Sequence, residues 1–415
     1  MSRAPLSCGA RFFTIICRSY IETQGRKMQP AKTPAEALIE AAKKGDVEKT
    51  RKLLDGGANP DGEPGSKDWT PLCAASYRGH SKTAALLLAY GADPNLRDRK
   101  GNRATPLWWA VSSGNDSLIR TLLKEGADPE KGNMNDMLPL SVAVAAGRLN
   151  IVQALIEHSA ATGGQGANIN AADKAGMTAL MRAAIKNDTC IMQLLIDNGA
   201  DVFQKNIHGL TALDIAVERN SEKAVGFLLS DKKRAADLLK ETDKHGDTAL
   251  VRAILKRNLN MVSLLLGAGA DTEITNSNGR TALHWAAVTG QTDIAEILLD
   301  YNASLTHQEN DGNTPLHFAG RSANEKMIET LLCWDAATLA KENSSLRLTN
   351  NEGLTAKDMA RRNGNGHKAV KLFTEWEAGE NSLRREFAVA RLQQKQSQQE
   401  QQRQKMRQFL RRPSP

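Results

Sequence analysis

Residues 279–303 read GRTALHWAAVTGQTDIAEILLDYNA and contain the pattern that decides the fold. Thr281 precedes a short apolar run and is a favourable helix N-cap, because its hydroxyl oxygen can accept from an amide of the first turn. The following IAEILL places apolar residues at i, i+3 and i+4, which predicts a second, amphipathic helix. The stretch also holds His284 and Trp285, which are either a reactive pair or two structural residues.

The same pattern occurs nine times in phase along the chain. The spacings between successive copies are 35, 33, 40, 33, 37, 33, 33 and 41 residues, so the base period is 33 with insertions of two to eight residues. One helix pair cannot bury enough apolar surface to offset its chain entropy, whereas stacked pairs cover one another. The period therefore predicts a solenoid of helix pairs with one long concave surface.

These segments resemble the ankyrin repeat, whose 33-residue unit carries T-P-L-H, then LL, then GAD. The copies include TPLCAA after Trp69, TPLHFA after Asn313 and the loop LLLGAGAD at 264–271. The resemblance covers residues 34–378, over 80% of the chain, and includes a first unit at 34–60 that lacks the T-P-L tripeptide. It implies an all-α ankyrin-repeat solenoid of about ten stacked helix-turn-helix units with β-turn or hairpin loops.

Charge divides the chain into three segments. Residues 1–33 form a basic leader or targeting segment with six Lys/Arg and one Glu, and residues 379–415 form a Gln/Arg-rich, helical or disordered tail with nine Lys/Arg and three Glu. The overall net charge of +8 therefore leaves about −3 on residues 34–378, which argues against a nucleic-acid surface on the repeat body. Five widely spaced cysteines fit neither a disulfide framework nor a zinc site and favour a reducing compartment.

Both ends leave alternatives open. Arg3, Arg11 and Arg18 would share one face of a helix in a segment that resembles a mitochondrial presequence. The alternatives are another targeting signal, a disordered leader, or translation that begins at Met28. We expect a cytoplasmic protein, with the mitochondrion as the alternative. The basic amphipathic stretch at 403–412 is either a solvated tail or a weak contact with RNA, a membrane surface or an acidic partner.

No catalytic constellation is present in the sequence. GxxxxGK[ST], GxGxxG, HExxH and GxSxG are all missing, so we expect no enzyme activity, no cofactor and no metal site. His284 and His317 occupy the fourth motif position, which the resemblance makes a structural site tying neighbouring turns together. Chemically unlike residues fill that position elsewhere, which argues against a shared reactive row: Cys73, Trp108, Ser141, Met181, Asp214, Val251 and Asp358. Trp109 and Trp285 replace a usual leucine, which favours core packing.

The remaining candidate site is the surface. The resemblance implies contacts at the ends of the first helices, here Tyr77, Arg78, Ile185, Lys186, Arg219, Leu255, Lys256 and Arg321. It also implies contacts at the turn tips, here Trp69, Lys174, Met177, Ile207, His208, Leu210, Lys244, His245 and Arg280, with Trp69 as an exposed aromatic anchor.

This mixture of cations and apolar residues predicts a protein partner with acidic and apolar features. The resulting hypothesis is a monomeric, non-enzymatic scaffold or adaptor. The alternatives are a secreted bacterial or parasite effector that uses the same solenoid on host proteins, a tail-dependent RNA or membrane-surface binder, and a solvated face without a single partner.

Overall fold

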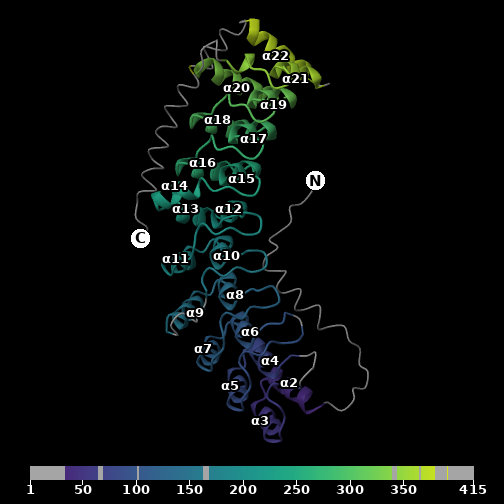
Figure 1. Ribbon diagram of the computed structural model, residues 1–415, viewed down its shortest axis with the longest axis vertical. Coiled ribbons are helices and arrows are strands. Elements are labelled where there is room, and N and C mark those ends of the chain that lie inside the picture. Colours follow the sequence, from purple (N-terminus) through teal and green to yellow (C-terminus); the bar gives the residue numbers. More distant parts are fainter. Residues whose placement is uncertain are drawn as a thin grey trace.

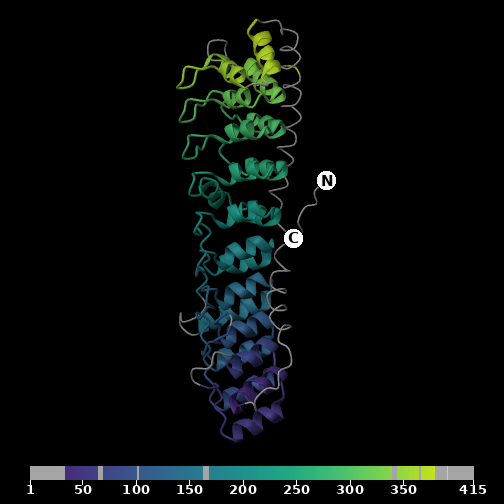
Figure 2. The same cartoon turned by 90° about the vertical axis from the view of Figure 1, so that its right-hand side faces the viewer.

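The computed structural model describes residues 33–63, 69–100, 102–161, 168–338, 344–363, 366–378 and 390. These residues form ten consecutive helix pairs stacked into an elongated, curved solenoid (Figures 1 and 2). The all-α fold expected from the sequence is confirmed. The predicted leader, apart from Thr33, and the predicted tail, apart from residue 390, lie outside the described residues, so the three-segment division stays a prediction.

Each pair has an inner and an outer helix. The pairs are α2 (Pro34–Lys44) with α3 (Val47–Asp55), α4 (Pro71–Arg78) with α5 (Ser81–Ala89), α6 (Pro106–Ser113) with α7 (Asp116–Lys124), α8 (Pro139–Ala145) with α9 (Leu149–Ala161), α10 (Ala179–Lys186) with α11 (Thr189–Asp197), α12 (Ala212–Glu218) with α13 (Glu222–Leu228), α15 (Ala249–Leu255) with α16 (Leu259–Gly267), α17 (Ala282–Thr289) with α18 (Thr292–Asp300), α19 (Pro315–Arg321) with α20 (Glu325–Thr338), and α21 (Ala356–Arg362) with α22 (His367–Ala378).

A threonine caps nine of the ten described inner helices. Its hydroxyl accepts an amide of the first turn, as Thr70 does from Cys73 at 3.1 Å. The fourth pair is the exception, because Leu138 stands at its cap position. The first unit lacks the T-P-L tripeptide, yet Thr33 caps α2 and Pro34 occupies its first turn, so this unit begins in the same way as the others.

Each inner helix packs on the inner helices before and after it, and the outer helices form a second row (Figure 1). Buried apolar side chains join both rows into one continuous core from Leu38 to Trp376. The loops between pairs project to one side of the stack (Figure 2). This arrangement presents the loop tips and the inner helices along the same curved face.

The insertions into the 33-residue period are partly helical. The 37-residue spacing accommodates an additional helix, α14 (Lys232–Leu238), which lies between α13 and α16 (Figure 1). In the 41-residue unit α20 continues to Thr338, and the 3-10 helix η2 (Ser345–Arg347) follows. Within the described part of the chain, no helix is both long and apolar enough to cross a bilayer.

Candidate protein-interaction face

The turn tips are built by a repeated side-chain cap. In the sixth repeat the side-chain oxygen Oδ1 of Asn206 accepts from the main-chain amides of His208 at 2.9 Å and Leu210 at 3.0 Å, closing the turn. The Ile207 amide then donates to the Ala175 carbonyl of the preceding tip at 3.3 Å. Equivalent bonds join most neighbouring tips, so the residues three and four places before each cap form a continuous, solvent-facing edge.

The structure divides the predicted contact residues into two groups. The exposed group is Arg78, Lys174, Lys186, Ile207, His208, Arg219, Lys244, His245, Leu255, Lys256 and Arg321. The half-buried group is Trp69, Tyr77, Met177, Ile185 and Arg280, and Leu210 is buried. Eleven of the seventeen predicted contact residues are therefore accessible to a partner.

The residue directly before each cap turns inward, which corrects the prediction for Leu210. At this position none of the nine motif repeats has an exposed side chain. Its backbone is engaged on both sides, since the Leu210 amide donates to the Asn206 side chain and its carbonyl accepts from the Asn206 amide at 3.0 Å. The Leu210 side chain therefore enters the core and is only 7% exposed.

Trp69 and Arg280, at this same position, are held by intramolecular contacts. The Trp69 ring lies 4.8 Å from that of Trp109 and 5.2 Å from that of Tyr77, so it belongs to an aromatic cluster and does not project. The Arg280 guanidinium lies 4.9 Å from the centre of the Phe318 ring, a cation–π contact. The exposed aromatic anchor predicted at Trp69 is therefore wrong.

The fourth motif residue points toward the next repeat. His284 Nδ1 accepts from the Thr281 amide at 3.1 Å, so its Nε2–H donates to the Asn313 carbonyl of the following repeat at 3.1 Å. Burial lowers the pKa of His284 to about 4, in agreement with a neutral ring. The equivalent donor–carbonyl pairs are His317 with Leu354 (3.0 Å), Trp108 with Met137 (2.9 Å) and Cys73 with Ala104 (3.6 Å).

The structural role predicted for the two histidines is therefore confirmed. Unlike side chains share this position because imidazole, indole and thiol can each donate to the same carbonyl. Trp109 is buried as expected, and its Nε1–H donates to Asp98 at 2.7 Å. Trp285 is only half-buried against the core.

Arg252 on α15 forms ion pairs with three carboxylates of the sixth and seventh repeats. Arg252 lies 2.6 Å from Asp243, 2.9 Å from Glu218 and 3.7 Å from Asp214. Burial opposes ionisation of Asp243, but the amides of His245 and Asp247 and the Arg252 guanidinium together hold its pKa below the usual value. These carboxylates are thus occupied within the protein.

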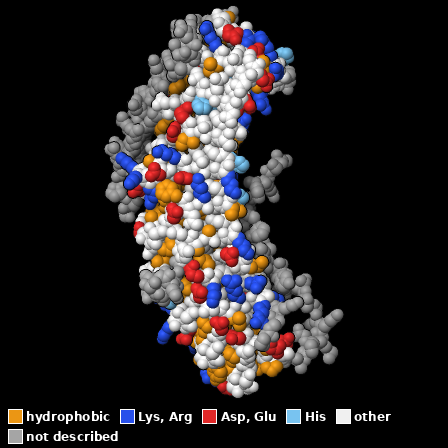
Figure 3. All heavy atoms as spheres, viewed as in Figure 1, with side chains coloured by type: hydrophobic (Ala, Val, Ile, Leu, Met, Phe, Trp, Pro, Cys, Tyr) orange, Lys and Arg blue, Asp and Glu red, His pale blue; other side chains and the backbone are white. Residues whose placement is uncertain are grey.

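The fifth to seventh repeats carry the densest set of exposed cations and apolar residues among the predicted contacts. We define the central face as Lys174, Lys186, Ile207, Arg219, Lys244, Leu255 and Lys256. Ile207 and Leu255 are 49% and 44% exposed, unusual values for large apolar side chains in this protein. Figure 3 shows Lys and Arg side chains at mid-height of the stack, over these repeats.

The tips change in character toward the C-terminus. The eighth to tenth repeats present Ser277, Asn278, Asn310, Asp311, Asn351 and Glu352 at the same two exposed positions. The central face therefore ends where uncharged and acidic tips begin.

The sequence places this architecture in a known family. Residues 15–342 match the profile of ankyrin repeats (3 copies) in overlapping blocks, well over half of the chain. The chain belongs to the ankyrin repeat family. Ankyrin repeats generally mediate protein–protein interaction, and the fold is typically a non-enzymatic interaction module.

Relatives of this ankyrin repeat protein are larger and diverse. It is 30% identical over 193 residues to the potassium channel AKT2/3 of Arabidopsis thaliana, covering 46% of this chain and 23% of the channel. It is 30% identical over 256 residues to the nuclear factor NF-kappa-B p105 subunit of Gallus gallus, covering 60% of this chain and 25% of that protein. The crystal structure of the ankyrin repeat domain of Bcl-3 is 29% identical with a TM-score of 0.49, covering 56% of this chain and 99% of that one. The chain spans about a quarter of the length of the two curated relatives.

Six exposed large apolar residues of this ankyrin repeat protein were missed by the sequence prediction: Tyr90, Met134, Leu149, Phe203, Leu259 and Val288. Met134 is 48% exposed at the tip of the fourth repeat, and its phase, four places before the cap position at Leu138, could have revealed it. Leu259 is 40% exposed at the start of α16, where the helical pattern alone predicts burial. In the described ranges no group of three or more His, Cys, Asp or Glu side chains could hold a metal ion.

Proposed function

We propose that this ankyrin repeat protein is a non-enzymatic scaffold or adaptor that binds a protein partner through the central face. The observation that carries the proposal is the exposure of Ile207 and Leu255 among the cations of three successive repeats. Apolar side chains anchor interfaces when they are desolvated, whereas surrounding charges orient the partner and speed its association. The partner's contact surface would then combine acidic and apolar side chains.

The charge arrangement supports this assignment of partner chemistry. Glu218 and Asp243 border the central face, and Arg252 already neutralises both. The lysines have no comparable compensation from carboxylates: Lys174 Nζ, for example, donates to the Met134 carbonyl at 2.6 Å. The face therefore keeps a positive field that favours an acidic partner.

The test is proximity labelling in the native cell with the full chain fused to a biotin ligase. The face variant carries Lys174→Glu, Ile207→Asp and Lys244→Glu on the tips. The matched control carries Lys82→Glu, Lys124→Glu and Leu149→Asp, which make the same chemical changes at exposed positions of the outer helices. Circular dichroism of the purified proteins establishes that both variants are folded.

We expect the face variant to lose labelled proteins that the wild type and the control both retain. An identical labelled set for all three proteins would contradict the proposal. The same labelling reports the compartment, for which we propose the cytoplasm, and a set dominated by mitochondrial proteins would contradict that assignment.

A further inference from the structure

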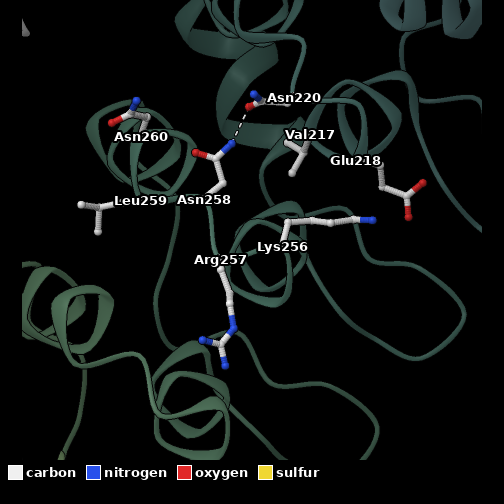
Figure 4. A pocket seen from close by; sticks show the side chains of 8 residues that line it. All are labelled: Val217, Glu218, Asn220, Lys256, Arg257, Asn258, Leu259 and Asn260. Atoms are coloured by element: carbon white, nitrogen blue, oxygen red, sulfur yellow. Dashed lines mark hydrogen bonds between the residues drawn. The ribbon is translucent and has the colours of Figure 1, made fainter. Parts of the chain in front are cut away.

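A pocket of about 470 Å³ opens between the sixth and seventh repeats, at the ends of their inner helices. Val217 and Glu218 of α12 and the junction residue Asn220 line one side, and residues 256–260 line the other. In Figure 4 Lys256 extends toward the same side as Glu218, whereas Leu259 and Asn260 lie opposite. Cations, amides and an apolar side chain thus line the pocket from different sides.

Both left-handed junctions at this pocket carry a side chain. Glycine occupies the left-handed junction between inner and outer helix in five repeats, at Gly45, Gly79, Gly114, Gly147 and Gly290. In the sixth and seventh repeats Asn220 and Arg257 hold this conformation, with φ of 56° and 57°. A left-handed backbone disfavours a long side chain such as arginine. These two junctions therefore place side chains where half of the repeats have glycine, as Asn187 and Ala323 also do in the fifth and ninth repeats.

The connection between neighbouring junctions also differs here. In four other repeats the side chain after the junction reaches back to a main-chain carbonyl, as Asn115 does to Gly79 at 2.7 Å and Gln291 does to Ile254 at 2.8 Å. Asn258 instead donates to the side chain of Asn220 (Figure 4). A bridge between two side chains spans the gap, and the pocket lies beside it.

The free charge of the pocket is positive. Glu218 is bound to Arg252 at 2.9 Å, so its carboxylate is compensated from behind. The Arg257 guanidinium is fixed by donating to the Thr289 carbonyl at 2.9 Å and keeps its charge beside the opening. Lys256 is exposed and extends from the end of α15. Leu255 and Leu259, 44% and 40% exposed, flank these two cations in the sequence.

We propose that this pocket binds an aspartate or glutamate side chain of a peptide segment, with an adjacent branched apolar residue packing on Leu255 or Leu259. The proposal rests on the proposed function, since it identifies one subsite of the interaction surface. Lys256 supplies the counter-charge, and the amides of Asn258 and Asn260 supply hydrogen-bond donors. The volume admits a side chain and part of a backbone, and the exposed leucines favour a peptide over a nucleic acid.

The experiment selects random twelve-residue peptides by display on the full chain and measures the enriched peptides by fluorescence anisotropy. We expect them to share an acidic residue next to Leu, Ile, Val or Phe. Lys256→Glu should weaken their binding about tenfold, because attraction between close charges becomes repulsion. Arg257→Gly keeps the backbone conformation and should weaken binding less. Lys124→Glu, the same charge change on the outer helix α7, should leave binding unchanged.

Four results would overturn the proposed binding of an acidic peptide in the pocket. Enriched peptides without an acidic residue would do so, as would binding that depends on Lys174 and Lys244 but is insensitive to Lys256→Glu; the latter would leave the proposed function intact. A single-stranded oligoribonucleotide whose binding is lost in Lys256→Glu would reassign the pocket to nucleic acid. Failure of the display selection together with unchanged proximity labelling in the face variant would remove both the pocket and the proposed function.

Discussion

At the scale of single residues, the buried histidines show how position determines chemistry. His284 accepts from its own cap with Nδ1 and donates to the next repeat with Nε2, so both ring nitrogens are used in the neutral state. A second proton would require Nδ1 to stop accepting from the Thr281 amide. The residue that looks most reactive in the sequence is therefore committed to joining two repeats.

This arrangement predicts a pH-dependent loss of stability. Burial lowers the pKa of His284 from about 6.5 to about 4, so the unfolded state binds the proton first as pH falls. The stabilisation is complete above pH 6.5 and is lost as pH falls toward 4, by roughly 2–3 kcal/mol at pH 4.5. His284→Gln should have a correspondingly flatter dependence of the urea midpoint on pH, followed by tryptophan fluorescence.

The control is His245→Gln at an exposed turn tip, which should retain the wild-type pH dependence. Carboxylates titrate in all three proteins and cancel in the comparison. Equal slopes for His284→Gln and the wild type would show that this ring does not contribute the pH dependence.

Single residues also mark the limit of what the sequence could predict for the surface. The phase of the repeat correctly placed Ile207 and Lys244 on exposed tips, because a turn tip cannot contact a neighbouring core. It could not separate Ile207 from Leu210, three residues later in the same turn. Their different exposure arises from the Asn206 side chain, which fixes the backbone of Leu210 inward.

At the scale of helices, the distance between neighbouring helices depends on residues at positions that the repeat motif does not specify. Gly320 on α19 faces α21, where an added Cβ would lie 2.3 Å from the Ala356 carbonyl oxygen. Gly226 on α13 has no such neighbour within 4 Å. Two glycines in helices of the same length thus have opposite packing requirements.

Alanine substitution at these two sites should have opposite effects on stability. Gly320→Ala should destabilise by about 1–3 kcal/mol, since α21 must move away from α19. Gly226→Ala should stabilise by roughly 0.5–1 kcal/mol through helix propensity and a less flexible unfolded chain. Urea denaturation of each variant measures both changes, and amide exchange should place the loss for Gly320→Ala in residues 315–378. Destabilisation of similar size at both sites would contradict the packing argument.

Helix pairs and their caps were largely predictable, because the threonine, the apolar spacing and the 33-residue period all report local preferences. The structure of the insertions could not be predicted from the sequence. Residues 232–238 form α14, although the same number of additional residues could have made a longer loop. Asp136, with φ of 58°, stands at a turn position where glycine is usual, and the sequence gives no sign that the left-handed turn persists there.

At the scale of the whole molecule, the main contacts between the described helices link neighbouring repeats, so stability propagates along the stack. The sixth and seventh repeats are the point where this propagation is most vulnerable. In this part of the described chain α14 lies between the outer helices α13 and α16, and the inner helices depend on the charge pairs of Arg252 (Figure 1). The same two repeats carry the pocket and five of the seven residues of the central face.

Arg252→Met should therefore divide the solenoid into two unfolding units. Removing the cation leaves the buried carboxylates of Asp214 and Asp243 without their counter-charge, with only hydrogen bonds from Thr211, His245 and Asp247 remaining. Breaking a buried ion pair in this way costs about 3–5 kcal/mol. Each repeat is coupled mainly to its neighbours. The lost ion pairs therefore weaken the interface between the N-terminal and C-terminal halves more than they weaken either half. Adding Asp243→Asn should recover part of the stability, since one buried charge is removed.

Amide exchange measured through a urea titration shows whether the solenoid unfolds as one unit or as two. In the wild type, protection in residues 34–200 and 280–378 should disappear over one range of urea concentration. In Arg252→Met the two regions should lose protection over separate ranges, because each half then keeps only its internal interfaces. Arg78→Met, which removes an exposed cation from α4, should retain the single range. Simultaneous loss of protection throughout Arg252→Met would show that coupling across the seventh repeat does not depend on this buried cation.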